Sequence, residues 1–266
     1  MGPLERRLDD LKHAGRHAPA RTPAPPITVA CSLSDVVGGR RATWQGIPFW
    51  HLAVPFKRIC GNLSFPARAF TEPIECEVAR DEFTRLDPAT TLVMDIETGG
   101  FSGTPVFLIG VVALDSHPLH VEQWLACDYP EEQAILGRLA RWARKRPCWV
   151  SFNGKSFDAP FVLDRATIYG IDLPPPQIHV DLLHLARRRW RGQLRDCRLE
   201  TLERHILDRT RVGDVPSCDV PDLFHHFIRT RNAAVLRPVL EHNRIDLVSS
   251  IELLLRLSRT NLRQPL

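Results

Sequence analysis

Two acidic side chains stand one residue apart at the end of an apolar run near the middle of the chain. The stretch "TLVMDIETGGF" places Asp95 and Glu97 just before a glycine pair. Because side chains alternate along a strand, both carboxylates would lie on the same face. Two carboxylates at close range raise each other's pKa, and a divalent cation between them removes that penalty. A strand end that opens into a polar loop is the competing interpretation of this pattern.

A third acid follows a second apolar stretch. "SFNGKSFDAPF" places Asp158 where a strand gives way to a helix, a usual position for ligands in sheets with helical connections. Asp158 also suits an ordinary helix N-cap, with Pro160 in the first turn. Asn153 and Lys155 in the same turn could contact a phosphate group, or could form a merely hydrophilic loop.

A histidine and a fourth acid occur on a long C-terminal helix pattern. His242 and Asp246 are four residues apart in "LEHNRIDLVSSIELLLRL" and therefore share one helix face. An imidazole titrates at roughly pH 6.5, so His242 could accept a proton at neutral pH. The pair could act as a base beside a metal ligand, or as an ordinary surface pair of the helix.

Taken in chain order, these residues resemble the motifs of the DEDD superfamily of 3′-to-5′ exonucleases, which have the ribonuclease H-like fold. D-I-E-T matches the first motif, N-x-x-x-F-D the second and H-x-x-x-D the third. The resemblance implies that His242 positions or deprotonates the attacking water, and that two divalent ions, Mg²⁺ or Mn²⁺, assist the reaction. The metal ligands that it implies are Asp95, Glu97, Asp158 and Asp246.

The third motif departs from the better-known branches, which use Tyr with three intervening residues or His with four. The segments "CRLETLERHIL", "DVPSCDVPDLFHHFIRT" and "LRPVLEHNRIDLVSSIELL" resemble the bacterial YprB-like ribonuclease H-like domain, in which H-N-x-x-D is usual. This likeness runs from about Thr91 to Leu257. Gly213, Asp214 and Ser217 stand where related sequences tend to carry two acids before "VP" and a glycine after it.

The order of apolar patterns predicts an α/β fold with a mixed sheet. Three β-branched runs with short separations favour antiparallel neighbours, and alternating helices and strands follow them. We therefore expect a ribonuclease H-like mixed five-stranded sheet flanked by helices. The expected strands are 91–97, 106–114, 120–127, 148–152 and 177–180, and the expected helices are 130–145, 159–170 and most of the remainder to 258.

Composition shifts divide the chain into four segments. Residues 89–258 are expected to form the ribonuclease H-like exonuclease domain, and residues 28–88, an accessory segment with short strands, are expected to pack against its sheet. Residues 1–27 read as a flexible basic tail with a proline-rich end, and residues 259–266 as a C-terminal tail.

A basic stretch follows the predicted fifth strand. Nine arginines against four acids lie between Arg187 and Arg211, although the whole chain carries a net charge of only +4. Arginines around an aromatic residue are typical of segments that bind a nucleic-acid backbone and stack on its bases. A solvated helix face is the alternative. With the turn residues Asn153 and Lys155, the candidate nucleic-acid contacts are Arg187, Arg188, Arg189, Trp190, Arg191 and Arg195.

The remaining composition excludes several classes of protein. The seven cysteines are widely scattered and include no C-x-x-C pair, which favours reduced thiols over disulfides or a zinc site and hence a cytoplasmic location. The chain contains no run of eighteen apolar residues and its start lacks the apolar core of a secretory signal, so we expect no membrane partner.

These observations lead to one expected function and two alternatives. The resemblance implies a two-metal 3′-5′ exonuclease that hydrolyses single-stranded nucleic acid. A catalytically inactive nucleic-acid-binding module and a structure-specific endonuclease on the same fold remain open, although a decayed site should have lost at least one of the four acids. DNA and RNA are not distinguished, because no motif reports a contact to the 2′-hydroxyl.

Overall fold

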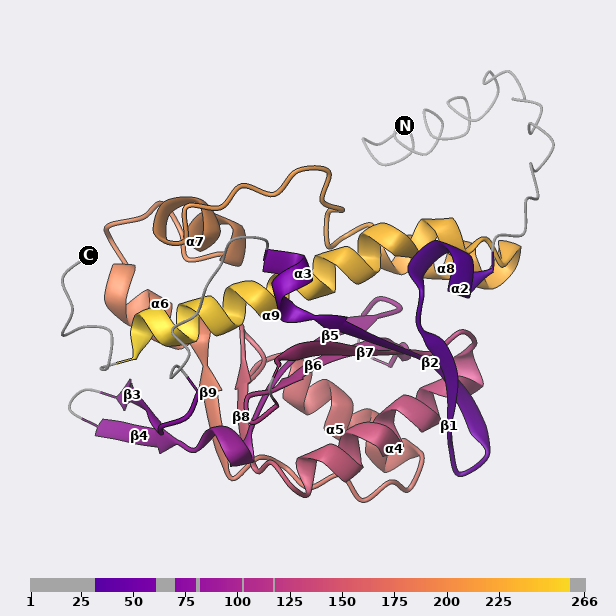
Figure 1. Ribbon diagram of the computed structural model, residues 1–266, viewed down its shortest axis with the longest axis horizontal. Helices are drawn as coiled ribbons and strands as arrows, with labels where there is room; N and C mark the ends of the chain where they lie inside the picture. The colour runs from indigo at the N-terminus through magenta and orange to yellow at the C-terminus, as the bar shows by residue number, and fades with distance from the viewer. Residues whose placement is uncertain (1–31, 61–69, 80–81, 102, 117, 259–266) are drawn as a thin grey trace, which may run out of the picture.

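A computed structural model describes residues 32–60, 70–79, 82–101, 103–116 and 118–258 of the chain (Figure 1). The two expected tails, 1–27 and 259–266, lie outside the described residues. A central twisted sheet is covered by helices on both faces. The predicted mixed α/β class is therefore confirmed.

The central sheet has seven strands in the spatial order β1-β2-β7-β6-β5-β8-β9. Strand β6 pairs antiparallel with both β5 and β7, whereas β5, β8 and β9 run parallel to one another. All five predicted strands are present among these seven. Their bounds are β1 (Arg40–Trp44), β2 (Ile47–Pro55), β5 (Thr91–Thr98), β6 (Val106–Ala113), β7 (His120–Leu125), β8 (Cys148–Ser151) and β9 (Ile178–Asp181).

The expected number of five strands is too low, because the accessory segment contributes two more. Strands β1 and β2 form a hairpin, and β2 pairs antiparallel with β7 along the edge of the sheet. Phe49 and Leu52 of β2 are buried in the core, but the strand does not alternate strictly between buried and exposed positions. A second hairpin, β3 (Ile74–Ala79) with β4 (Glu82–Leu86), stays separate from the central sheet.

Different helices cover the two faces of the central sheet. Helices α4 (Glu132–Ala143) and α5 (Asp158–Ile168) lie on one face, and the long helix α9 (Arg237–Leu257) crosses the other (Figure 1). The other helices of four or more residues are α2 (Leu33–Val37), α3 (Phe56–Cys60), α6 (Leu182–Trp190), α7 (Leu199–Ile206), α8 (Val220–Thr230) and the 3₁₀ helix η3 (Ala233–Leu236).

The prediction of nearly continuous helix from about residue 180 to 258 is wrong between residues 191 and 198 and, over a longer stretch, between residues 207 and 219. In the longer stretch no helix forms from residue 207 to residue 219. Asp208 has a left-handed backbone with a φ of 50°, Gly213 has a φ of 71°, and Pro216 lacks a backbone donor. These residues interrupt the helical hydrogen-bond pattern and leave an irregular segment above α9.

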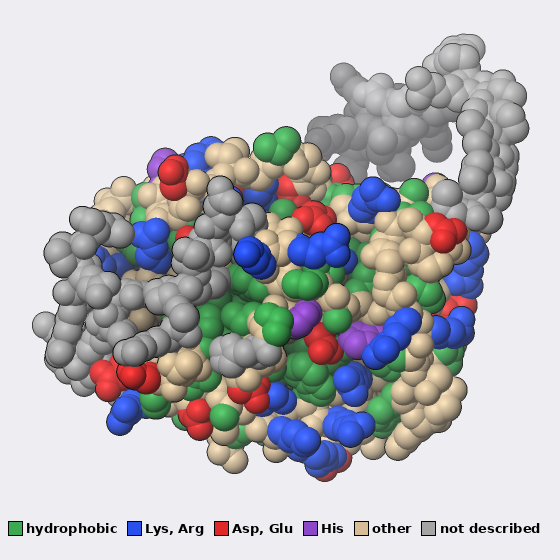
Figure 2. Space-filling model, in the orientation of Figure 1, with side chains coloured by type: hydrophobic (Ala, Val, Ile, Leu, Met, Phe, Trp, Pro, Cys, Tyr) green, Lys and Arg blue, Asp and Glu red, His purple; other side chains and the backbone are tan. Residues whose placement is uncertain are grey.

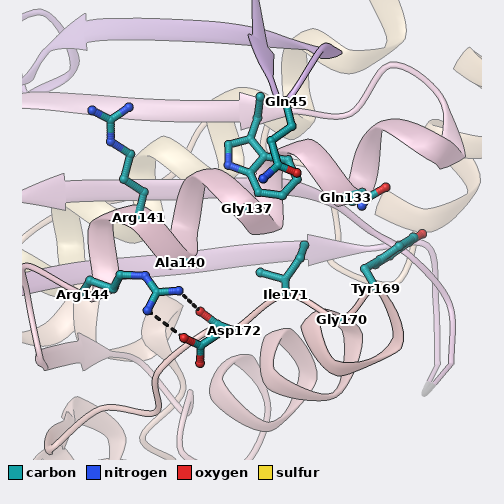
Figure 3. Close-up of a pocket in the computed structure, with 11 residues that line it drawn as sticks. Gln45, Gln133, Gly137, Ala140, Arg141, Arg144, Tyr169, Gly170, Ile171 and Asp172 are labelled. Atoms are coloured by element: carbon teal, nitrogen blue, oxygen red, sulfur yellow. Dashed lines mark hydrogen bonds and ion pairs between the residues drawn. The ribbon is translucent and has the colours of Figure 1, made fainter.

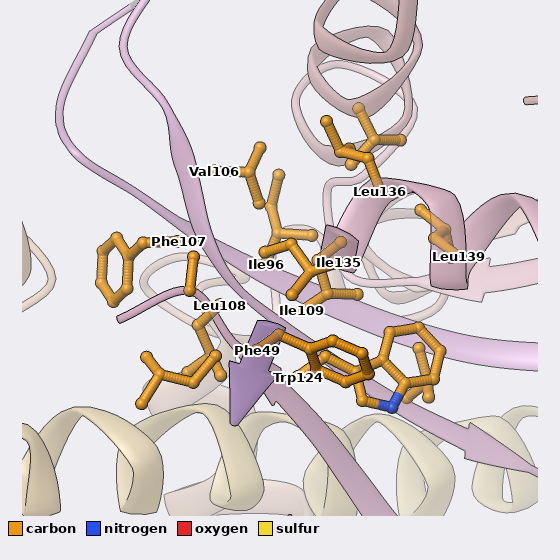
Figure 4. Close-up of a cluster of buried hydrophobic side chains, with 14 of the residues drawn as sticks. Phe49, Ile96, Val106, Phe107, Leu108, Ile109, Trp124, Ile135, Leu136 and Leu139 are labelled. Carbon is orange, nitrogen blue, oxygen red and sulfur yellow. The ribbon is translucent and has the colours of Figure 1, made fainter. Parts of the chain in front are cut away.

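Alternation along β5 sends its side chains to two different cores. Leu92, Met94 and Ile96 belong to the cluster that faces α4, whereas Val93 belongs to the cluster under α9. Figure 4 shows part of the first cluster, in which Ile96 and Ile135 lie between the strands and the helix. Asp95 and Glu97 have the same parity as Val93 and therefore lie on the α9 side.

Two further observations on the described residues concern membrane-spanning helices and cysteines. Within these residues, no helix is both long enough and apolar enough to cross a membrane. Five cysteines in this part are free thiols, namely Cys76, Cys127, Cys148, Cys197 and Cys218.

Candidate active site

Strand β5 presents the first two acids toward α9. Asp95 and Glu97 are partly exposed, and the sheet register shifts just after Glu97, where the strand leaves its regular pairing with β6. Asp95 accepts a hydrogen bond at its Oδ2 from Nδ2 of Asn243 on α9, over 2.8 Å. The carboxylate of Asp95 is thus held by the helix and does not extend into a polar loop.

Asp158 reaches the same place from the start of α5. Phe157 holds the N-cap position, so the alternative that Asp158 is an ordinary N-cap does not describe the structure. Its Oδ1 accepts from the backbone N–H of Ile96 at 3.1 Å. The parallel pairing of β5 and β8 brings their carboxyl ends together, which places the start of α5 beside Asp95. A Cβ at Gly154 would lie 2.2 Å from Oγ and 2.6 Å from Cβ of Ser151, so this turn requires a glycine.

Helix α9 contributes the histidine and the fourth acid. His242 is buried, which excludes an ordinary surface pair with Asp246. Nδ1 of His242 lies 2.8 Å from Oδ1 of Asp214, and Nε2 lies 3.4 Å from Oγ of Ser217 and 3.8 Å from Oδ2 of Asp246. One ring nitrogen is therefore engaged by a carboxylate while the other faces Asp246.

Burial and mutual electrostatic repulsion raise the pKa values of the four acids. Burial raises the pKa of Asp95 well above its ordinary value, and the charges of Asp246, Asp158 and Glu97 raise it further. Burial and the nearby Asp246 and Asp158 raise the pKa of Glu97 in the same way. Burial raises the pKa of Asp158 to about 7, and it raises that of Asp246 despite the opposing charge of Arg211. A site of this kind favours either protons or a cation.

The donor chemistry of this cluster fits a hard divalent cation. Its members are all carboxylates, which suit Mg²⁺ and Mn²⁺. Within the described residues, however, no three acidic, histidine or cysteine groups already converge as a ligand set. Asn243, the Ile96 amide and Arg211 each bind one carboxylate oxygen, those of Asp95, Asp158 and Asp246 respectively.

An ion-pair network that the sequence motifs do not reveal lies beside His242. Arg211 donates to both carboxylate oxygens of Glu203 at 2.6 Å, to Asp214 at 2.8 Å and to Asp246. These carboxylates raise the pKa of the Arg211 guanidinium although its burial lowers it. In the sequence, Arg211 is one member of a basic run, and no motif marks it as part of an ion-pair network.

One pocket lies beside the acid cluster, and another lies away from it. A pocket of about 270 Å³ opens beside His242 and Asp246, between the start of α7 and the irregular segment, and both Arg198 and Arg211 line it. A second pocket of about 320 Å³ lies between α4, the turn after α5 and the β1–β2 turn, where Arg144 pairs with Asp172 (Figure 3). None of the predicted site residues lines the second pocket.

The candidate nucleic-acid contacts are not brought together at the acids. The arginines at 187–189, 191 and 195 are exposed at the far end of α6 and in the turn after it, which is about 13 Å along the helix from Asp181. Trp190 is half-buried and packs against the core under α9. Asn153 and Lys155 are exposed beside Asp158, with their backbone N–H groups bound to Asp181. Figure 2 shows basic side chains spread over one face among acidic ones.

The sheet order and the position of the acids define the class of the domain. Three antiparallel strands followed by two parallel ones, with acids on the first strand, at a strand-to-helix junction and on the last helix, describe a ribonuclease H-like domain. The family described as the RNase_H superfamily matches residues 92–258, and the chain belongs to that family as a YprB-like ribonuclease H-like domain protein of nuclease type.

The chain is also similar to one curated protein in sequence and to one solved structure in fold. The chain is 34% identical over 170 residues to the uncharacterised protein YprB of Bacillus subtilis (strain 168), a match that covers 62% of this chain and 41% of YprB. Its fold is similar, with a TM-score of 0.52 and 15% identity, to the family B DNA polymerase of the hyperthermophilic archaeon Pyrobaculum calidifontis. That similarity covers 69% of this chain and 28% of the polymerase. The chain thus spans less than half the length of either protein.

Proposed function

We propose that this protein is a divalent-metal-dependent 3′-5′ exonuclease that hydrolyses phosphodiester bonds of single-stranded DNA or RNA. The observation that carries the proposal is the cluster of four acids from β5, α5 and α9, whose pKa values are raised by burial and by one another beside a buried histidine. Such a cluster has little structural value by itself, because unpaired like charges destabilise the fold.

The four acids would hold two ions, Mg²⁺ or Mn²⁺, with Asp95 and Glu97 on one strand and Asp158 and Asp246 facing them. When bound, the two metals would lower the pKa of the attacking water and stabilise the leaving oxygen. Asp214 accepts the Nδ1 proton of His242, which leaves the lone pair of Nε2 free to accept a proton from water. The pKa of Asp214 lies below its ordinary value, because contacts with Arg211 and His242 outweigh its partial burial.

The pocket beside His242 supports an end-recognising site. It is small, it lies next to the proposed base, and two arginines line it. A phosphate group of a terminal nucleotide would be attracted by Arg198, which is exposed there. The 3′-to-5′ direction and the preference for single strands rest on the resemblance to the DEDD motifs. A cytoplasmic location belongs to the same proposal and is supported by the free thiols in the described part of the chain.

One contact favours the alternative of an inactive nucleic-acid-binding module. Arg211 pairs with Asp246 and so supplies positive charge at an expected metal ligand. In that case the network of Glu203, Arg211 and Asp214 would replace the metals as the source of neutralising charge. The presence of all four acids speaks for the exonuclease, and an assay separates the two functions.

The test uses 5′-labelled single-stranded DNA and RNA with Mg²⁺, Mn²⁺ or EDTA. The wild-type protein is compared with an Asp95→Asn, Asp246→Asn double variant, which keeps the shape of the site but removes two charges. A ladder of products that shorten one nucleotide at a time, blocked by a non-hydrolysable 3′-terminal linkage, supports the exonuclease. Discrete internal cuts point to the endonuclease. Binding without cleavage under any metal condition rejects the proposal in favour of the binding module.

A further inference from the structure

A buried amide on α9 holds the first acid of the site. Asn243 is fully buried, with 0% of its surface exposed. Its Nδ2 donates to Oδ2 of Asp95 at 2.8 Å and lies 3.2 Å from the backbone oxygen of the same residue. The side chain of Asp95 is thereby fixed against its own strand, in one rotamer.

The sheet is built to admit this amide. Asp95 on β5, Gly110 on β6 and Gln123 on β7 stand opposite one another in register across three neighbouring strands. A Cβ on Gly110 would lie 2.1 Å from Oδ1 of Asn243, so only glycine leaves space for the amide above the middle strand. This requirement explains a glycine in the centre of a fully buried strand, where it otherwise weakens the sheet.

The direction of the amide is set from the far side. Nε2 of Gln123 donates to Oδ1 of Asn243 at 2.8 Å and to the backbone oxygen of Leu240 at 2.9 Å. Oε1 of Gln123 accepts from Nε of Arg244 at 2.7 Å. A guanidinium can only donate, so Arg244 fixes which end of Gln123 faces it, and Gln123 then fixes which end of Asn243 faces Asp95.

We propose that the chain Arg244–Gln123–Asn243 makes Asn243 a positioning residue for metal binding, by keeping an N–H group directed at the carboxylate of Asp95. The inference rests on the proposed function, in which Asp95 is a metal ligand. Hydrogen bonds of this kind orient a ligand and select the oxygen that faces the metal. The two amides act only through Asp95 and are not themselves catalytic residues.

The decisive variant is Gln123→Glu, which alters no residue of the acid cluster. A glutamate still accepts from Arg244, but it cannot donate to Oδ1 of Asn243, so the Asn243 amide should turn and direct its oxygen at Asp95. The extra negative charge alone would tighten binding of a cation. Weaker binding would therefore report the amide orientation and not the charge.

The readout is Mn²⁺ affinity, measured by electron paramagnetic resonance or calorimetry, together with the melting temperature in EDTA. We expect Gln123→Glu to bind Mn²⁺ at least tenfold more weakly. Its metal-free melting temperature should stay close to that of the wild type, because the buried counter-ion that the glutamate gives Arg244 offsets the lost bond to the backbone oxygen of Leu240. Asn243→Leu, which removes the donor directly, provides a second test if the first variant folds poorly.

Asp95→Asn is the reference that separates the two proposals. If Asp95→Asn loses Mn²⁺ binding while Gln123→Glu and Asn243→Leu bind as the wild type does, the positioning role is rejected and the metal site stands. If Asp95→Asn itself binds Mn²⁺ normally, the proposed metal site is wrong and the positioning role falls with it. Weaker binding in all three variants, with Gln123→Glu retaining its melting temperature, supports both.

Discussion

At the scale of single residues, Asp158 gives the metal-free protein a measurable pH dependence. Burial, followed by the charges of Asp181 and Asp246, raises its pKa from an ordinary value of 3.8 to about 7. A carboxyl with a raised pKa in the folded state stabilises the fold fully below about pH 4, and that contribution declines steadily until the pH has risen through 7. We therefore expect the wild-type protein in EDTA to be more stable at pH 5.5 than at pH 8.

Asp158→Asn should remove this dependence. The amide keeps an oxygen for the Ile96 N–H but carries no charge, so the free energy of unfolding in EDTA should rise at both pH values, by about 2 kcal/mol more at pH 8 than at pH 5.5. Urea unfolding at both pH values measures it. Asp164→Asn, an exposed change on the same helix, is the matched control. A variant that is less stable than the wild type at pH 8 would contradict the charge cluster.

The contact between Asp214 and His242 leads us to predict an effect of Asp214 on turnover. Asp214→Asn replaces the acceptor at Nδ1 with a group that can also donate, so the imidazole can take the wrong tautomer. We expect kcat to fall at least tenfold in the proposed exonuclease assay, with Mn²⁺ affinity within about threefold of wild type. Ser217→Ala is the control, because its 3.4 Å contact with Nε2 is long for a hydrogen bond and its loss should change kcat little. Unchanged turnover in Asp214→Asn would remove His242 as the base.

At the scale of elements, the β1–β2 hairpin completes the sheet edge and part of the core. Leu52 of β2 is 1% exposed and belongs to a buried hydrophobic cluster of the central sheet, whereas the neighbouring Ala53 is exposed. Leu52→Ala should lower the free energy of unfolding by about 2–4 kcal/mol, because it leaves a cavity beside β7. Ala53→Ser should have almost no effect. Urea unfolding of the two variants compares them directly, and equal stability would mean that the hairpin is not part of the folded core.

The sequence was sufficient to predict the helices and strands whose hydrophobic periodicity is strong. Strands β5, β6 and β7 are long apolar runs, and α4 spaces Ile135, Leu136 and Leu139 on one face, so both kinds of element could be predicted. The hairpin of residues 40–55 could not be placed, because its burial is irregular and its pairing with β7 joins segments about 70 residues apart. Long-range pairing of this kind leaves no local pattern.

The same reasoning applies to the candidate site. Short motifs mark Asp95, Asp158 and Asp246, since Asp95 forms a D-x-E pattern with Glu97, Asp158 begins a helix and Asp246 follows His242 by four residues on one helix. Glu203 and Arg211 carry no such mark, because their partners lie on other elements and depend on the path of the irregular segment. Gly110 and Asn243 likewise acquire their meaning only when α9 lies across the sheet.

At the scale of the whole molecule, the excess of positive charge is small and its placement decides how a nucleic acid would approach. The exposed Arg187, Arg189 and Arg191 lie beyond the acid cluster at the end of α6, and none of them lines the pocket beside His242. A single-stranded nucleic acid whose 3′ end reaches the acids could continue toward these arginines. They would then contact its phosphates and contribute affinity without changing the chemistry.

Replacing Arg187, Arg189 and Arg191 by alanine should weaken binding of single-stranded DNA in EDTA and reduce its salt dependence. Each lost phosphate contact lowers the slope of log K against log salt concentration by about 0.7 for a single strand, so the slope should fall by about 2. Fluorescence anisotropy between 50 and 200 mM salt, conditions over which such electrostatic binding changes strongly, provides the measurement. An Arg141→Ala, Lys145→Ala variant is the control, because these exposed residues lie on and just after α4, across the sheet from α9. If the control variant lowers this slope as much as the triple variant does, the single-stranded DNA follows another path over the protein.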